Sequence, residues 1–107
     1  MTRWKQTERK VAEYLGGVRV PITGRIRGSA PDVEHSTLAI EIKDREKLPF
    51  WIKDAMNQAV ASKVNDDQIP VAIFRQKRQK YKDAYCMLKM SDLKLLMEKY
   101  EESTNDD

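Results

Sequence analysis

The segment 31–43, PDVEHSTLAIEIK, constrains the fold of this chain more than any other stretch. Its second half, residues 37–43, alternates apolar and other side chains, which is the period of a β-strand with one buried face. The apolar set is Leu38, Ile40 and Ile42, and the opposite set is Ala39, Glu41 and Lys43. The pattern therefore predicts a strand with a core on one side and a polar surface on the other.

The polar side of this strand carries groups that suit phosphate chemistry. Asp32 follows Pro31 shortly before the strand, and Glu41 and Lys43 lie near the strand's end. Two carboxylates and an ammonium group, once brought together, can hold a divalent metal ion and a water molecule beside a phosphate. Neither a Pro-Asp pair nor a Glu-x-Lys triplet is informative alone. Their order along the chain carries the hypothesis.

Length and charge predict one domain that binds a polyanion. The chain has 107 residues and a net charge of +3, a length typical of a single domain. Residues 98–107 hold five acidic residues and one lysine, whereas residues 1–97 hold 19 basic and 12 acidic residues, a net charge of +7. A basic body predicts nucleic acid as the first partner. Ordinary solubilising charge is the alternative.

Several classes of site and location are excluded or disfavoured. Cys86 is the only cysteine, which excludes an intrachain disulfide framework and a cysteine-based zinc site. His35 is the only histidine, so paired-histidine zinc sites are excluded and Ser-His catalysis is disfavoured. The start of the sequence, MTRWKQTERK, has no apolar signal-peptide core, and no apolar run approaches the roughly 20 residues of a membrane span. We expect a cytoplasmic protein, in the host cytoplasm if the source is a virus.

The first predicted element is a helix over residues 2–15 that ends at the glycine pair 16–17. Its apolar stripe contains Trp4, Val11 and Leu15, and Glu8 falls on the same stripe. A carboxylate on a buried face costs free energy unless it is paired or binds metal. Glu8 is therefore either a site residue or an edge residue with its head in water.

A short strand over residues 18–21 and a loop over 22–30 precede the Pro-Asp pair. The loop, ITGRIRGSA, is rich in hydrogen-bond donors, and its Arg25 and Arg27 suit a phosphate backbone. A plain surface hairpin is the alternative. After a short strand over residues 31–34, the turn at 35–36 leads into the alternating strand.

The rest of the chain predicts two more helices around an apolar strand. A crossover helix between two strands favours a right-handed connection into a parallel pair, with the second strand buried on both faces. The predicted elements are a helix over 49–64, a buried strand over 70–74, a basic turn over 75–82, a strand over 84–89, a helix over 91–100 and a disordered acidic tail over 101–107. Candidate nucleic-acid contacts are Gln58 at the edge of the first of these helices, with Lys77, Arg78 and Lys80 in the basic turn beside Tyr81. Surface glutamine and a solvated hairpin are the respective alternatives.

The order of these elements resembles the PD-(D/E)xK nuclease superfamily, whose core runs α-β-β-β-α-β. Within it, the chain is most similar to the archaeal-type Holliday junction resolvases. The resemblance covers about residues 4–76 and rests on TERKVAEYLGG, the basic loop, APDVE and LAIEIK. It implies an α/β fold with a restriction-endonuclease-like core, in which helices flank a central mixed β-sheet, over a single nuclease domain of residues 1–100.

The resemblance also implies roles for individual residues. Asp32 and Glu41 would bind the metal together with the backbone carbonyl of Ile42, and Lys43 would orient or activate the attacking water. Glu8 matches a further carboxylate of the metal site, and Ser29 lies near a serine that the family's loop often carries. The implied cofactor is Mg²⁺, with Mn²⁺ as a substitute.

The implied function is a Mg²⁺-dependent endodeoxyribonuclease that acts on branched DNA, a four-way junction, as a homodimer. Two symmetry-related subunits suit this reaction because resolving a junction requires two matched cuts. The alternatives are another PD-(D/E)xK DNA nuclease, of the restriction-like, repair or single-strand kind, and a nucleic-acid-binding module without catalysis.

Overall fold

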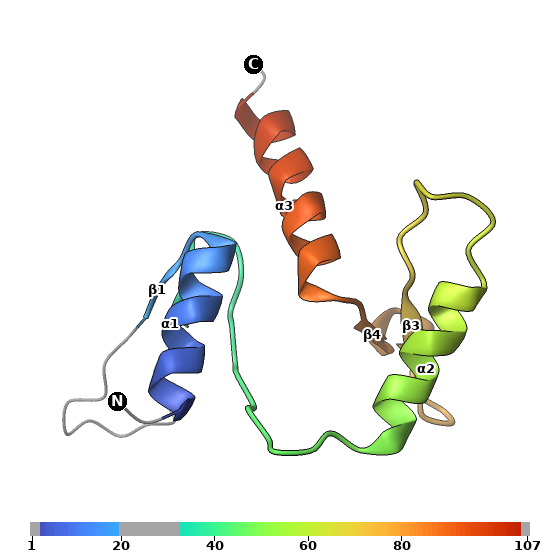
Figure 1. Cartoon of the computed structure of the whole chain (residues 1–107). Helices are drawn as coiled ribbons and strands as arrows, with labels where there is room; N and C mark the ends of the chain where they lie inside the picture. The colour runs from blue at the N-terminus through green and yellow to red at the C-terminus, as the bar shows by residue number, and fades with distance from the viewer. Residues whose placement is uncertain (1–2, 20–32, 106–107) are drawn as a thin grey trace. The chain divides into compact units, whose positions relative to one another are not determined.

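The structure is a computed structural model that describes residues 3–19 and 33–105 (Figure 1). Its contacts divide it into two compact units, residues 1–46 and 47–107. The described residues form three helices and two separate two-stranded antiparallel sheets, one sheet in each unit. The prediction of an α/β protein is confirmed at this level. A central mixed sheet is not shown by the described residues.

The first unit begins with helix α1 (Arg3–Leu15), as predicted. The helix ends in a Schellman motif, because Gly16 takes a φ of 79° and the Gly17 N–H donates to the Ala12 carbonyl at 2.8 Å. The chain then turns back along the helix. A Cβ on Gly17 would lie 2.6 Å from both the Glu34 carbonyl oxygen and Val33 Cγ1, so this position requires glycine.

Helix α1 packs against an antiparallel pair, β1 (Val18–Arg19) and β2 (Val33–Glu34). Val18 pairs with Glu34, and Arg19 pairs with Val33. Val33 is fully buried and also forms an antiparallel bridge to Ile40. β2 therefore has neighbours on both edges, and with Ala12 its Val33 forms the apolar centre of this unit.

Residues 37–43 adopt the predicted alternation without the predicted strand. Side chains at even positions from Leu38 to Asp44 are half-buried, and those at odd positions from Ala39 to Lys43 are exposed. Hydrogen-bonded pairing is limited to the single bridge at Ile40. The prediction of a regular strand is wrong over this range because a period-two pattern fixes which side chains turn inward, whereas a strand also requires successive paired residues on a neighbour.

The second unit begins with helix α2 (Phe50–Ala61), which starts directly after Pro49 and ends before the predicted limit at residue 64. It packs against β3 (Ala72–Phe74) through Trp51 and Phe74, whose rings meet edge to face with centroids 5.3 Å apart. β3 pairs with β4 (Tyr85–Met87) in antiparallel register, with Ile73 opposite Cys86.

Among the described residues, β3 pairs with β4 in antiparallel register, and the parallel pairing predicted through the crossover helix stays a prediction. The prediction of burial on both faces of this strand is corrected. The apolar run 70–74 predicted burial on both faces, but Ala72 is buried whereas Ile73 is 67% exposed. Because neighbouring residues of a strand point to opposite faces, the hairpin buries only the face that carries Ala72.

Helix α3 (Met90–Asn105) is longer than predicted and takes in most of the acidic tail. The prediction of disorder is wrong for residues 101–105, and residues 106–107 lie outside the described part. Glutamate is a good helix former, and the Thr104 hydroxyl donates to the Glu101 carbonyl at 3.0 Å near the helix end. Among residues 3–19 and 33–105, no helix is long and apolar enough to cross a membrane.

Candidate functional site

The buried carboxylate predicted from the helical stripe is present. Glu8 is only 4% exposed and is the one buried charged residue of the part of the chain that the structure describes. Its Oε1 accepts a hydrogen bond from Arg19 Nε at 2.9 Å, which also makes a salt bridge between α1 and β1. The reading of Glu8 as an edge residue with its head in water is therefore wrong.

Arg19 is a residue that the sequence pattern did not single out. It lies eleven residues after Glu8, beyond the glycine turn, so helical spacing cannot connect the two. The sequence feature that could have identified Arg19 is the short strand after the glycine turn. Neighbouring residues of a strand point to opposite faces, so one of Val18 and Arg19 must face the helix. A buried carboxylate paired in this way is held in one orientation, with its second oxygen not engaged by this bond.

Glu41 and Lys43 lie together, as predicted. Lys43 Nζ is 3.2 Å from Glu41 Oε1, and their side chains are 67% and 60% exposed respectively. Residues two apart meet in this way when the backbone is extended and both side chains point to the same face. The Glu-x-Lys triplet thus presents a carboxylate and an ammonium group to solvent, opposite the half-buried Ile40 and Ile42.

A hydrogen bond connects this triplet to the helix that carries Glu8. Thr7 Oγ1 donates to Asp44 Oδ2 at 2.5 Å. Thr7 is next to Glu8 in α1, and Asp44 directly follows Lys43. The bond holds the two regions at neighbouring points within one compact unit. It joins residues 37 positions apart, which is why local patterns could not predict it.

The metal site itself is not assembled by the described residues. Within residues 3–19 and 33–105, no group of three Asp, Glu, His or Cys side chains is placed to hold a metal ion. Asp32, the predicted third carboxylate, lies outside the described residues, as do the predicted DNA contacts Arg25, Arg27 and Ser29. The metal-ligand roles of Glu8, Asp32, Glu41 and Ile42 stay predictions.

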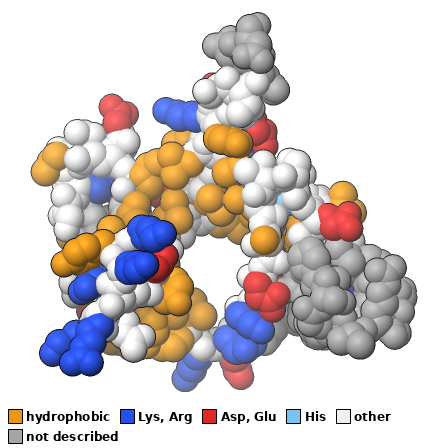
Figure 2. Space-filling view, turned by 180° about the vertical axis from the view of Figure 1, so that it is seen from behind, with side chains coloured by type: hydrophobic (Ala, Val, Ile, Leu, Met, Phe, Trp, Pro, Cys, Tyr) orange, Lys and Arg blue, Asp and Glu red, His pale blue; other side chains and the backbone are white. Residues whose placement is uncertain are grey.

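The predicted DNA contacts of the second unit lie on two different elements, helix α2 and the turn between β3 and β4. Gln58 Nε2 donates to Asp54 Oδ2 at 2.8 Å on the exposed side of α2, which is an ordinary surface pair one helical turn apart. Lys77, Arg78 and Lys80 are exposed in the turn between β3 and β4. Figure 2 shows Lys and Arg side chains, in blue, at several places on the surface of the molecule.

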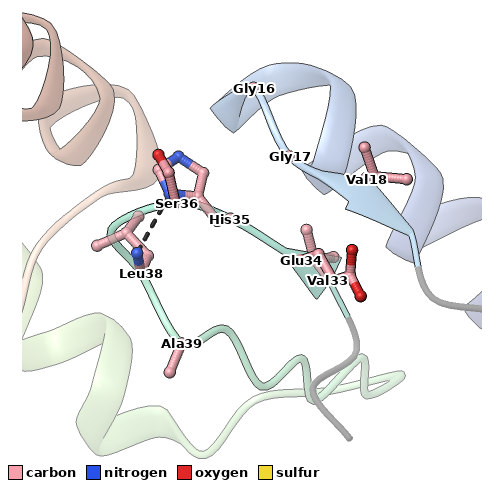
Figure 3. A pocket seen from close by; sticks show the side chains of 9 residues that line it. All are labelled: Gly16, Gly17, Val18, Val33, Glu34, His35, Ser36, Leu38 and Ala39. Carbon is pink, nitrogen blue, oxygen red and sulfur yellow. Dashed lines mark hydrogen bonds between the residues drawn. The ribbon is translucent and has the colours of Figure 1, made fainter.

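A hollow of about 670 Å³ lies in the first unit, at the end of α1 (Figure 3). Its lining residues are Gly16, Gly17, Val18, Val33, Glu34, His35, Ser36, Leu38 and Ala39. None of the described residues predicted to bind metal or to be catalytic lies among them. The hollow is open, and the ionisable side chains in its lining are those of Glu34 and His35.

His35 has a structural role at this hollow. Its Nδ1 accepts hydrogen bonds from the backbone N–H groups of Thr37 and Leu38, at 3.0 and 3.1 Å, the second drawn in Figure 3. Its Nε2 is 2.9 Å from the Leu15 carbonyl oxygen, at the end of α1. Because Nδ1 accepts, Nε2 carries the proton and donates. The ring therefore joins the helix end to the turn before the Glu-x-Lys segment.

Replacing this ring tests its role in the turn. His35→Ala removes three hydrogen bonds and is expected to lower the free energy of unfolding by about 1–2 kcal/mol. His35→Asn is expected to lose less, because an asparagine side chain can accept from the backbone two residues on. Urea denaturation of the three proteins measures both effects. Equal stability of His35→Ala and the wild type would contradict this role.

Comparisons of the chain with protein-family models, with curated proteins and with solved structures found no match.

Proposed function

We propose that this chain is a metal-dependent DNA endonuclease of the PD-(D/E)xK type, with a restriction-endonuclease-like core. The observation that supports the proposal most is the placement of Glu41 and Lys43. They meet on the exposed face of an extended segment, and the hydrogen bond between Thr7 and Asp44 fastens that segment to the helix carrying the buried Glu8. This is the setting in which a carboxylate and an ammonium group can act on one phosphate.

We propose that Asp32 and Glu41 are ligands of a shared metal ion. Asp32 lies outside the described residues, and directly precedes Val33, which forms an antiparallel bridge to Ile40, the residue before Glu41.

The donor types fit a hard divalent cation. Mg²⁺ prefers carboxylate and carbonyl oxygens and keeps several waters, which the carboxylates of Asp32 and Glu41 and the Ile42 carbonyl would satisfy. A bound Mg²⁺ would shield the phosphate charge and make a water molecule more acidic. Mn²⁺ takes the same ligands.

The protein's own groups would position the reactants. The Lys43 ammonium group donates hydrogen bonds and accepts none, so beside Glu41 it can hold the attacking water and a phosphate oxygen in place. Glu8 would contribute negative charge near the site, with its orientation set by Arg19. We propose that the protein acts in the cytoplasm as a homodimer, and that four-way DNA junctions are its substrate.

A cleavage assay tests this function. Labelled four-way junction, matched duplex and single strand are incubated with the full chain in Mg²⁺, in Mn²⁺ and in EDTA. Paired, symmetric cuts in the junction alone support a resolvase, whereas cuts in duplex or single strand support another nuclease of the same type. Binding without cleavage of any of the three substrates would overturn the enzyme proposal in favour of a binding module.

Mg²⁺ is also expected to stabilise the fold. A ligand that binds only the folded state at ten times its Kd contributes about 1.4 kcal/mol, which raises the Tm of a chain this size by roughly 6 °C. Thermal denaturation with and without millimolar Mg²⁺, at matched ionic strength, measures the shift. The Asp32→Ala variant is the control, and an equal shift in that variant would argue against the proposed ligands.

A further inference from the structure

The basic turn, residues 75–82, links β3 to β4 and is a concentrated patch of positive charge. Its sequence RQKRQKYK holds five basic residues and no acidic one, and ends in the short 3-10 helix η2 (Tyr81–Asp83). Lys77, Arg78, Lys80 and Lys82 are all exposed. The turn belongs wholly to the second unit, so its geometry does not depend on the proposed metal site.

Gln79 holds the turn in one shape. Its side-chain oxygen accepts from the Gln76 N–H at 3.0 Å, and its Nε2 donates to the Asp83 carbonyl at 2.8 Å. Its backbone N–H donates to the Gln76 carbonyl at 2.9 Å, and its own carbonyl accepts from Arg75 Nε at 3.0 Å. A turn fixed by four hydrogen bonds presents its cations with little remaining backbone freedom.

Arg78 is held in a conformation that side chains rarely adopt. Its φ is 75°, and it is the one residue other than glycine with a positive φ among residues 3–19 and 33–105. Such a backbone costs on the order of 1–3 kcal/mol and persists only where the surrounding structure offsets that cost. Strain of this kind is frequent at binding sites, and in this turn the next residue, Gln79, makes four hydrogen bonds.

Tyr81 offers a flat ring next to these cations. It is 81% exposed, and the guanidinium carbon of Arg75 lies 4.2 Å from the ring centroid on one face. The exposure leaves the opposite face accessible to a partner. An exposed aromatic ring beside a row of cations is the combination that binds single-stranded nucleic acid, because bases stack on the ring while cations contact the phosphates.

We propose that the basic turn is a binding site for single-stranded DNA. One unpaired base stacks on the open face of Tyr81, and Lys77, Arg78 and Lys80 contact the flanking phosphates. Arg75 supports the ring from the other side by a cation–π contact. The alternative is a hairpin turn that only contacts solvent. That alternative accounts for the Gln79 hydrogen bonds, which stabilise the turn, but it gives no reason for a tyrosine that is 81% exposed. That the partner is DNA rests on the proposed function, whereas the binding itself needs no metal.

Binding of a fluorescent oligothymidine of about 12 nucleotides, followed by anisotropy in EDTA, tests the stacking. Tyr81→Leu removes the ring and is expected to weaken binding about tenfold, whereas Tyr81→Phe keeps the ring and binds as the wild type does. Tyr100→Leu, at an exposed tyrosine of α3, is the matched control and is expected to have no effect. Circular dichroism confirms that each variant is folded.

The phosphate contacts have a separate signature. A protein that neutralises a phosphate of single-stranded DNA loses affinity with salt, with a log–log slope of about 0.7 per contact. The double variant Lys77→Ala with Lys80→Ala is therefore expected to reduce the slope by about 1.4, whereas Tyr81→Leu leaves the slope unchanged.

Several results would overturn the proposal. These are wild-type affinity in Tyr81→Leu, an equal loss in Tyr100→Leu, an equal loss on matched duplex, or no binding of oligothymidine by the wild type. The Glu41→Gln variant separates this site from the proposed nuclease. This variant is expected to bind oligothymidine with the affinity of the wild type. If it loses cleavage but keeps this binding, the result supports a single-strand site that is independent of the nuclease site.

Discussion

The Glu41→Gln variant is expected to lose Mg²⁺-dependent cleavage by about a thousandfold and to keep its fold. A metal at a reacting phosphate contributes several kcal/mol of transition-state stabilisation, and each 1.36 kcal/mol is tenfold in rate. Glutamine keeps the size of the side chain but removes the charge that would hold the metal. The measurement is the single-turnover rate on a labelled junction at saturating protein.

The exposure of Glu41 makes this variant a clean test. Its side chain is 60% exposed and its pairing with Lys43 is open to solvent, so losing the pair costs at most about 1 kcal/mol of stability. Glu46→Gln removes an exposed negative charge five residues further along and is the matched control. Equal cleavage by Glu41→Gln and Glu46→Gln, with both proteins folded, would remove Glu41 from the mechanism.

Local patterns predicted the elements well where one period governs the structure. The helical stripe of α1, the glycine stop at Gly16 and the inward position of Glu8 could all be read from spacing. The alternation over residues 37–43 also predicted which side chains turn inward and that Glu41 and Lys43 share a face. These features depend on neighbours within a few residues, which a sequence displays directly.

Features that depend on distant partners could not be predicted in this way. The ion pair between Glu8 and Arg19 and the hydrogen bond between Thr7 and Asp44 cross the glycine turn or most of the first unit. Residues 101–105 were predicted to be a disordered acidic tail. They are helical in the structure, in keeping with the helix-forming tendency of glutamate.

The Arg19→Met variant is expected to lower the free energy of unfolding by about 3 kcal/mol. Methionine keeps much of the apolar stem but removes the charge, so the buried Glu8 carboxylate loses its ion-pair partner. Removing one member of a buried pair costs more than the pair contributes, because the remaining charge stays out of water without compensation. Chemical denaturation of the two proteins measures the difference.

The double variant Glu8→Leu with Arg19→Met separates this cost from the packing of arginine. With both charges removed, no uncompensated carboxylate remains, and the protein is expected to regain at least half of the stability that Arg19→Met loses. Arginine contributes packing and further contacts in either background, so their loss appears in both variants and cancels in the comparison. If the double variant is no more stable than Arg19→Met, the loss comes from those contacts. Glu8 would then be a carboxylate that this fold can bury without its partner, as a metal ligand must be before the ion binds.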